Sequence, residues 1–553
     1  MSDVTSEIRV PVLIVGGGPV GMTLAMCLHA LNVPCLIANT EISPRWHPKG
    51  STQNARTMEI YRRLGIAKTL RGMGLGQDYA LDIGYFTRLT GWELTRIEQP
   101  SEQEKQARIA AAGPTHQVPE PMLRLNQMIC EDHLFKHIQT LAGIDVRFGW
   151  QITAFTPRSD GVGAEIEHVE SGRRQRIEAQ YIVGCDGGRG IVRRQLGIKY
   201  GGDSANPDKP AYLNGRMVST YVSAPDFFKR IPHKRCWQYW TVNRDIRSNT
   251  MVVDQSTDIL FGTTLRNPDD KPDPAVIARQ FVASFGENID FNIIDNKPWT
   301  AGHALVAERF GEGRVILCGD SAHLFTPTGG FGLNTGNDDA FNLGWKLAAL
   351  TQGWGGPALL ASYEIERRPI AQRNTAAGKA LARSVGAVPI GDAINEVSPE
   401  GDAARKTAAD FLSTFGEEFA SLGVQLGARY DHSPVIAGED IAPPPDDPAV
   451  YAPTSLPGGR APHLWLDGHR SLYDQLGNGF TLLRFNRDTE TGALEKAAKT
   501  LRMPLAVVDV ASAPGRDLYA RDLALIRPDM VVAWRGNRLP EDCTALVARV
   551  TGR

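Results

Sequence analysis

Val12-Leu-Ile-Val-Gly-Gly-Gly-Pro-Val-Gly21 is the stretch that decides the fold of this 553-residue chain. Its four apolar residues predict a short buried strand, and Gly16, Gly18 and Gly21 follow at G-x-G-x-x-G spacing. In such a turn the first glycine permits a tight connection, the second lets backbone approach a pyrophosphate, and the third lets the next helix pack closely on the strand. Pro19, followed by Val20, suits the first turn of that helix. The N-terminus of the helix would favour phosphates.

The surroundings of this glycine turn strengthen a signal that is weak alone, because glycine turns after strands are common. An apolar helical pattern follows it, and residues 33–39 then form a second apolar run. Strand, helix and strand of this length predict a βαβ unit.

The overall composition is that of a globular protein without nucleic-acid or membrane partners. Hydrophobic residues make up 42% of the chain and charged residues 22%, which is ordinary for a soluble domain. The net charge of −2 gives no electrostatic reason to bind nucleic acid or a membrane surface. No apolar run reaches the ~18–20 residues of a membrane span, and the polar N-terminus is not a signal peptide. Seven scattered cysteines indicate reduced thiols and a cytoplasmic protein.

The pattern of the chain changes twice after the opening unit. Between about residues 200 and 300, aromatic-rich alternating runs predict an antiparallel sheet with one open face. Buried-strand character returns at residues 313–320 and is followed by a long helix. The polar, proline-bounded segment 98–121 is interpreted as a surface insertion, and the proline-rich stretch 442–448 as a linker. Beyond the linker, residues 523–534 predict a hairpin that turns at Pro528-Asp529.

We therefore predict four regions. The predicted bounds are residues 1–200 and 300–390 for a discontinuous nucleotide-binding domain, with parts of 75–125 joining the next region, residues 200–300 for an inserted substrate sheet, residues 391–450 for a helical connection and proline-rich linker, and residues 455–553 for a C-terminal domain.

Three motifs in order carry a family resemblance. They are the glycine turn, Cys185-Asp186-Gly187-Gly188, and Gly319-Asp320-Ser-Ala-His-Leu-Phe-Thr-Pro-Thr-Gly-Gly-Phe-Gly332. The set resembles the class A FAD-dependent aromatic hydroxylases, the group of p-hydroxybenzoate and phenol hydroxylases. Gly459-Arg-Ala-Pro-His463 and Gly479-Phe-Thr-Leu-Leu483 resemble the thioredoxin-like domain of the phenol hydroxylase branch. The resemblance implies an α/β chain: a Rossmann-like FAD-binding domain, an inserted antiparallel-sheet substrate domain and a C-terminal thioredoxin-like domain.

The third motif is where the resemblance places the flavin ring. Asp320 ends a predicted buried strand, where an unpaired carboxylate would be costly. The resemblance implies that it accepts a hydrogen bond from a ribityl hydroxyl, with a helix N-cap role as the alternative. Gly330 and Gly332 would let backbone pass close to a flat ring, and Pro327 would lie beside the reacting edge. Leu333 and Asn334 would open a helix whose positive end faces the flavin pyrimidine edge.

Further residues match family positions around the cofactor. Asp186 and Gly187 would serve FAD and the nicotinamide cofactor, with a plain turn as the alternative. Arg45, Arg124 and Gln127 match positions near the FAD phosphates, although the arginines could instead be surface charges. The residues expected to bind FAD are Gly16, Gly18, Pro19, Val20, Gly21, Asn39, Arg45, Arg124, Gln127, Asp186, Gly187, Gly319, Asp320, Gly330, Gly332, Leu333 and Asn334.

Two positions depart from the family pattern. Asn39 stands where a glutamate usually accepts from the adenosine ribose, although an amide oxygen can also accept. Ser51 stands where part of the family has a phenol-activating aspartate. His47, Tyr239 and His323 are candidates for substrate contact, with core or surface roles as their alternatives.

The resemblance implies a monooxygenase that hydroxylates a phenolic ring ortho or para to a hydroxyl. NADH or NADPH would reduce FAD, and O2 would react through a flavin C4a-hydroperoxide. The alternatives are a tailoring hydroxylase of a larger polyketide-like aromatic, which the aromatic-rich sheet also permits, and an FAD-binding scaffold without catalysis. The missing C-x-x-C motif counts against a disulfide oxidoreductase. No metal is expected, and we expect a homodimer in which the C-terminal domain has a structural or dimer-contact role.

Overall fold

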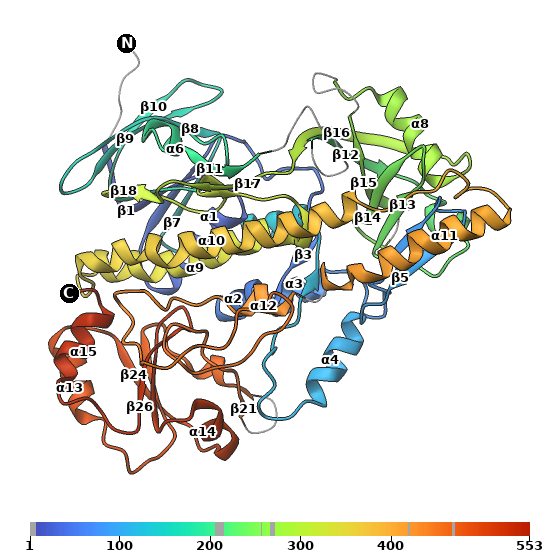
Figure 1. Cartoon of the computed structure of the whole chain (residues 1–553). Coiled ribbons are helices and arrows are strands. Elements are labelled where there is room, and N and C mark those ends of the chain that lie inside the picture. Colours follow the sequence, from blue (N-terminus) through green and yellow to red (C-terminus); the bar gives the residue numbers. More distant parts are fainter. Residues whose placement is uncertain (1–6, 205–214, 256, 266–270, 419–420, 467–469) are drawn as a thin grey trace.

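The computed structural model describes all residues except 1–6, 205–214, 256, 266–270, 419–420 and 467–469. Figure 1 shows three units: a sheet-and-helix unit that carries the N-terminus, a second sheet beside it, and a C-terminal unit below. The long helix α10 (Pro357–Gly386) runs along the first unit toward the second sheet. This arrangement confirms the fold class that the sequence predicts.

The first unit is built on an eight-stranded sheet with β1 in its middle. The order is β18-β19-β10-β1-β2-β7, and β8 and β9 extend it from β10. β1 pairs in parallel with both β10 and β2, and β10 pairs in parallel with β19. Its strands are β1 (Glu7–Val15), β2 (Cys35–Asn39), β7 (Ile144–Phe148), β8 (Trp150–Pro157), β9 (Val162–His168), β10 (Arg174–Gly184), β18 (Gly311–Glu312) and β19 (Val315–Leu317).

Burial on both faces explains why β1 carries a continuous apolar run. Val12, Leu13 and Ile14 are fully buried, as expected for a central parallel strand. Because parallel strands end at one edge of the sheet, β1, β10 and β19 deliver the three sequence motifs to the same edge. The helices that pack in this unit are α1 (Pro19–Ala30), α5 (Gln127–Ile138) and α9 (Phe331–Thr351).

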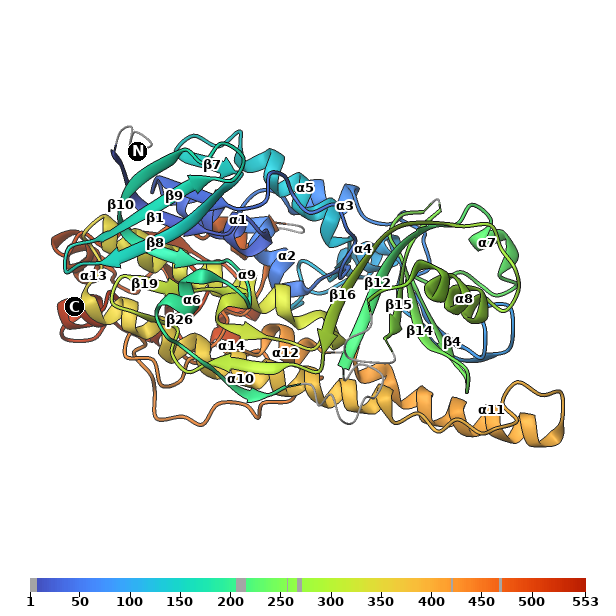
Figure 2. The same cartoon turned by 90° about the horizontal axis from the view of Figure 1, so that it is seen from above.

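The second sheet has seven strands in the order β16-β12-β15-β14-β13-β4-β5. One face is covered by α8 (Pro274–Phe285), where Phe281 contacts Phe261 of β15 with ring centroids 5.3 Å apart. The neighbouring residue Leu260 packs on the other face against Met128 of α5. The strands are β4 (Ile83–Phe86), β5 (Glu93–Ile97), β12 (Gly215–Ser223), β13 (Gln238–Val242), β14 (Arg247–Val252), β15 (Asp258–Thr264) and β16 (Asn292–Ala301). The open face expected from the sequence is therefore turned toward the first unit, as Figure 2 shows from above.

The C-terminal unit has thioredoxin-like topology. Its sheet order is β24-β23-β25-β26, with β23 and β24 parallel and the other pairs antiparallel. The hairpin predicted to turn at Pro528-Asp529 is confirmed between β25 and β26. The elements are β23 (Phe480–Arg484), α13 (Gly492–Thr500), β24 (Leu505–Asp509), α14 (Ala513–Tyr519), β25 (Leu523–Ile526), β26 (Val532–Gly536) and α15 (Cys543–Val550).

The connection between these units is helical and then irregular. After α10 the chain forms α11 (Pro399–Leu412), which packs beside β5, and the short α12 (Leu422–Leu426). Residues 442–448 contain no helix or strand. Among the residues that the structure describes, no helix has the length and apolar character needed to cross a bilayer.

The segment 98–121 is more than the surface insertion expected from its polarity. It contains α4 (Glu102–Ala110), whose Lys105 is buried and donates to the carbonyl of Met122 at 2.8 Å. Further along, the Gln117 carbonyl accepts from Arg460 of the C-terminal side at 2.8 Å. The polar residues of this segment therefore form contacts between units, which a hydropathy pattern does not distinguish from solvent exposure.

His463 makes the attachment of the C-terminal unit sensitive to acid. Its Nδ1 lies 2.6 Å from the carbonyl oxygen of His116, and its Nε2 lies 2.9 Å from Ser471 Oγ. Burial lowers the pKa of His463 to about 3, so the folded state holds this imidazole neutral.

We expect His463 to destabilise the protein progressively as the pH falls below about 6.5, because the unfolded chain takes up a proton that the folded chain excludes. At pH 4 this should amount to on the order of 3 kcal/mol relative to pH 7. Denaturant unfolding at several pH values should therefore show a shallower acid dependence for His463→Asn. The matched control His432→Asn, at an exposed position, should keep the parent slope, and equal slopes for all three proteins would contradict the prediction.

Candidate FAD site

The first glycine turn requires glycine at two positions and leaves room at a third. Gly16 has φ +109°, and a Cβ there would lie 2.3 Å from the carbonyl oxygen of Cys185. A Cβ at Gly21 would lie 2.1 Å from the Gly16 carbonyl oxygen. At Gly18, by contrast, a Cβ would meet nothing within 4 Å. This open backbone at the start of α1 fits the pyrophosphate of a dinucleotide cofactor.

Asn39 supports this turn from the end of β2. Its Oδ1 accepts from the Gly17 N–H at 3.0 Å, and its Nδ2 donates to the carbonyl of Glu41 at 3.2 Å. The side chain therefore holds the turn, while the second lone pair of Oδ1 keeps the acceptor capacity expected for a ribose hydroxyl.

The second motif is tied directly to the third. The Asp186 carboxylate accepts from the Val192 N–H at 3.0 Å and from Ser321 Oγ at 2.9 Å. Ser321 Oγ in turn accepts from the Gly187 N–H at 3.1 Å. Burial raises the pKa of Asp186 despite these hydrogen bonds. Asp186 thus joins two strand ends of the site.

The Gly319-Asp320 turn differs from the expectation in one respect. Gly319 has φ +64°, and a Cβ there would lie 3.1 Å from Cγ1 of Val20, which follows Pro19 in α1. Asp320 was expected to be buried at the end of the strand, but it is exposed in the turn that follows β19. Its carboxylate avoids the desolvation penalty of burial and is open to a ligand hydroxyl.

The glycine-rich segment is held against the short strand β3 (Thr52–Gln53). A Cβ at Gly330, which has φ +64°, would lie 3.0 Å from Thr52 Cβ. Asn334 accepts from the Asn54 N–H at 2.9 Å and donates to the carbonyls of Thr52 and Gly330 at 2.9 and 2.6 Å. Its side chain therefore fixes the loop and is buried by protein partners.

The other predicted residues of this segment lie around the start of α9. The helix begins at Phe331, two residues before the expected start at Leu333. Leu333 and Gly332 are partly buried in its first turn. Pro327 is exposed just before the positive-φ pair Gly329 and Gly330.

The three residues matched to the FAD phosphates differ in burial and in the partners of their side chains. Arg45 is exposed, with Glu41 3.7 Å away. Gln127 donates to Glu131 at 2.5 Å within α5. Arg124 is buried and donates to Thr52 Oγ1, and its guanidinium lies 3.8 Å from the ring centroid of Trp237.

The Arg124–Trp237 stack joins the first unit to the second sheet and was missed by the sequence analysis. Arg124 and Trp237 line a small cavity together with Ser51. Ser51 Oγ accepts from Asn126 at 3.2 Å. No local pattern signals this contact, because its members are separated by about a hundred residues or more. The position of the family aspartate is thus a buried hydroxyl beside a cation and an aromatic ring.

His47 lies at the same seam between the two units. It is buried, and its Nδ1 lies 3.1 Å from Asp295 Oδ2 on β16. Lys297 contacts the same carboxylate oxygen at 3.1 Å. Burial lowers the pKa of His47, although Asp295 opposes the shift. His47 therefore positions the loop against the second sheet.

Tyr239 and His323 are core residues, which corrects their expected contact with substrate. The Tyr239 hydroxyl accepts from the Cys236 N–H at 2.9 Å, and its ring packs on Phe227 on the α8 side of the sheet. His323 is fully buried, with Nε2 2.5 Å from Asp339 Oδ2. Strand alternation predicts that one face is open but does not say which one.

We expect Tyr239→Phe to leave kcat and KM unchanged while lowering stability. Without the Tyr239 hydroxyl, the buried N–H of Cys236 has lost its acceptor, which costs about 1–3 kcal/mol. Chemical denaturation and steady-state kinetics on the same preparation measure the two effects. Lost turnover at unchanged stability would instead place the Tyr239 hydroxyl at the substrate.

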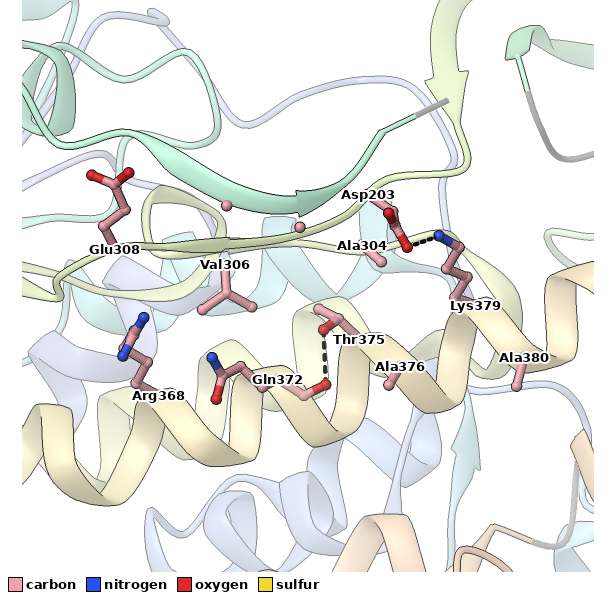
Figure 3. A pocket seen from close by; sticks show the side chains of 12 residues that line it. Asp203, Ala304, Val306, Glu308, Arg368, Gln372, Thr375, Ala376, Lys379 and Ala380 are labelled. Carbon is pink, nitrogen blue, oxygen red and sulfur yellow. Dashed lines mark hydrogen bonds and ion pairs between the residues drawn. The ribbon is translucent and has the colours of Figure 1, made fainter. Parts of the chain in front are cut away.

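A further cavity lies outside this site. It has a volume of about 510 Å³ and separates β11 (Tyr200–Asp203) and β17 (Ala304–Ala307) from α10. Figure 3 shows Val306 and Glu308 facing Arg368 and Gln372 of α10, with Lys379 paired to Asp203 at one end. None of the residues expected to bind FAD lines it.

Comparison with known proteins identifies the family to which this chain belongs. Residues 9–377 match the family model described as an FAD binding domain, and residues 454–553 match the C-terminal domain of aromatic-ring hydroxylases. The chain belongs to the FAD-dependent aromatic-ring hydroxylases. The first match contains all the residues expected to bind FAD, and the second covers the thioredoxin-like unit.

Individual members of the flavoprotein hydroxylases match nearly the full chain. A putative polyketide hydroxylase from Streptomyces halstedii is 30% identical, with 95% of this chain and 93% of that protein covered. The 2,4-dichlorophenol 6-monooxygenase of Delftia acidovorans is 28% identical, with 98% and 97% covered. The structure of chromopyrrolic acid-soaked RebC with bound 7-carboxy-K252c matches with a TM-score of 0.88 at 30% identity, covering 99% of this chain and 100% of RebC.

No cluster of three or more metal-ligating His, Cys, Asp or Glu side chains occurs within the described parts of the chain. The open backbone at Gly18, the exposed carboxylate of Asp320 and the two positive-φ glycines beside Pro327 are the features that fit FAD.

Proposed function

We propose that this flavoprotein hydroxylates a phenolic aromatic ring ortho or para to a hydroxyl group, with O2 as oxidant and NADH or NADPH as electron donor. The observation that carries the proposal is the junction of three strand ends, which brings Gly18, Asp186 and Asp320 to one edge of the sheet. FAD, when bound there, supplies the oxygen chemistry.

The chain's own residues bind and enclose the reactants in this proposal. The face of the second sheet that carries Leu260 is turned to the first unit and would form one wall of the substrate site. The Arg124–Trp237 stack closes the seam beside Ser51. Ser51 has no carboxylate to accept the phenolic proton. The buried cation of Arg124 beside it would instead favour a substrate that enters already ionised, as the phenolate.

The size of the substrate separates two candidates. The likeness to the dichlorophenol monooxygenase supports a single-ring phenol, and the likeness to the polyketide hydroxylase and to RebC supports a larger fused aromatic. The polyketide hydroxylase is 30% identical to this chain and the dichlorophenol monooxygenase 28%, and the match to RebC covers 100% of RebC. The larger aromatic is therefore kept as the alternative substrate class. A homodimer in the cytoplasm is also part of the proposal, to be checked by light scattering and by cell fractionation.

The test uses the purified FAD-containing enzyme. NADH and NADPH oxidation are followed with single-ring phenols, their carboxylates and fused-ring phenols, together with mass spectrometry of the products and an assay for released hydrogen peroxide. We expect one class to accelerate oxidation and to yield one hydroxylated product per donor oxidised, with little peroxide. Retained FAD without stimulation or product from any phenol would favour an FAD-binding scaffold that lacks catalysis.

A further inference from the structure

Cys185 and Cys318 each stand immediately before one of the two aspartate motifs, Asp186-Gly187 and Gly319-Asp320. They follow the paired ends of β10 and β19, where Gly184 lies opposite Leu317 in a parallel ladder. The Cys318 N–H continues that ladder and donates to the Gly184 carbonyl at 2.9 Å. The two cysteines are therefore cross-strand neighbours at the edge of the sheet that forms the FAD site.

The spacing of these two cysteines permits a bond between them. Adjacent strands lie about 4.7–4.9 Å apart, and disulfides form between Cα atoms about 4.4–6.8 Å apart. Both cysteines are free, and their strand ends are already joined by the hydrogen bond from the Cys318 N–H to the Gly184 carbonyl. The closing movement is consequently small.

The two thiols differ in access to solvent. Cys318 is fully buried, and burial raises the pKa of its thiol well above its ordinary value. Cys185 is partly exposed and touches the glycine turn, since a Cβ at Gly21 would lie 3.3 Å from Cys185 Cβ. A cofactor held by this turn would cover Cys185. Oxidant access to Cys185 therefore depends on whether FAD is bound.

We propose that Cys185 and Cys318 form a disulfide when hydrogen peroxide meets the FAD-free protein, and that this bond blocks rebinding of FAD. The proposal rests on FAD binding alone and holds whichever aromatic substrate the enzyme takes.

The chemistry of this oxidation is a two-step thiol oxidation. The Cys185 thiolate attacks one peroxide oxygen, the O–O bond breaks, and sulfenic acid and water form after proton uptake. The Cys318 sulfur then attacks the Cys185 sulfur, the S–O bond breaks, and a second water leaves with the Cys318 proton. Two thiols lose two electrons in total, and one hydrogen peroxide is reduced to two waters.

The bond would disturb the FAD site because both cysteines are joined to it. An S–S bond of about 2.05 Å draws the two strand ends together. The Cys185 carbonyl is the group against which the Gly16 backbone packs, and Gly319 follows Cys318 directly. We therefore expect the oxidised protein to bind FAD about tenfold more weakly or worse, a change of at least ~1.4 kcal/mol.

The experiment compares FAD-free and FAD-loaded protein exposed to the same hydrogen peroxide. Non-reducing peptide mapping should find the Cys185–Cys318 cross-link in the FAD-free sample and much less in the loaded one. FAD titration by fluorescence should show the weakened rebinding, with recovery after dithiothreitol. Absence of the cross-link in the FAD-free sample, or a cross-linked protein with undiminished FAD affinity, would overturn the proposal.

Two variants separate the disulfide from general oxidative damage. Cys318→Ser should stop at a Cys185 sulfenic acid that dimedone traps, and it should keep its FAD affinity after peroxide. Cys543→Ser, at a buried cysteine of the C-terminal unit, should behave as the parent does. If Cys318→Ser loses FAD rebinding as the parent does, the cross-link is not the cause and the proposal fails. Circular dichroism before oxidation confirms folding, and Cys318→Ala replaces any serine variant that does not fold.

Discussion

Glu366→Gln is expected to lower the free energy of unfolding by about 3–5 kcal/mol, because it leaves buried Lys346 without its paired carboxylate and removes one of the two carboxylates that face buried Arg527. Glu366 of α10 accepts from Lys346 Nζ at 2.7 Å and from Arg527 at 2.7 and 2.9 Å. All three side chains have no solvent exposure. Burial alone would raise the pKa of Glu366, but the charges of Arg527 and Lys346 hold it far below its ordinary value.

The same cluster fastens the C-terminal unit to the FAD-binding unit. Arg527 follows β25, and it also pairs with Asp529 at 2.5 Å. Denaturant unfolding followed by tryptophan fluorescence measures the loss directly, since Trp345 lies beside the cluster with Arg527 5.0 Å from its ring centroid. The change should therefore loosen both units together.

A matched control for Glu366→Gln is Asp410→Asn, which breaks an exposed pair with Lys406 on α11. The side chains of Lys406 and Asp410 are 75% and 67% exposed, so this change should cost less than ~0.5 kcal/mol. Equal stability of the Glu366→Gln and Asp410→Asn variants would mean that the buried cluster does not hold the units together.

Gly18→Ala is expected to fold normally and to bind FAD about 10–100-fold more weakly, a loss of ~1.4–2.7 kcal/mol. In the protein itself a Cβ at Gly18 meets nothing within 4 Å, so the methyl group interferes only with a ligand that approaches the backbone. FAD titration of the stripped protein measures affinity, and thermal unfolding without FAD measures the fold.

Gly16→Ala, in contrast, should lower the stability of the fold itself. Its φ of +109° and the 2.3 Å approach to the Cys185 carbonyl strain the fold by about 1–3 kcal/mol even without FAD. Gly113→Ala, at an exposed glycine that also has nothing within 4 Å of a Cβ, should match the parent in both assays. If the Gly18→Ala protein bound FAD as tightly as the parent does, the pyrophosphate would not lie at this turn.

Much of the fold could be predicted because its signals are local. The apolar run 12–15 and the glycines after it lie within ten residues, and steric rules for a tight turn act over that range. The Pro528-Asp529 hairpin is equally local. The class of the second sheet followed from strand alternation, which is a property of neighbouring residues.

The errors concern which partner a side chain meets. Alternation places Tyr239 on one face of its strand but does not state that α8 covers that face. Polarity placed residues 98–121 at the surface, although Lys105 is buried there. Asp320 was expected to be buried because it follows an apolar strand, but the turn carries it into solvent.

The sequence by itself determined that a glycine turn follows the first strand and that two aspartate motifs follow later strands, whereas the thioredoxin-like unit was expected from a family resemblance. Turn sterics and hydrophobic periodicity act between residues close in sequence, so the turn and the two motifs are readable from the chain. Only the tertiary structure decided that Cys185 and Cys318 lie side by side on neighbouring strands, that Arg124 stacks on Trp237, and that Glu366 pairs with Arg527. Those contacts join residues more than a hundred positions apart, and the packing of whole sheets and helices brings them together.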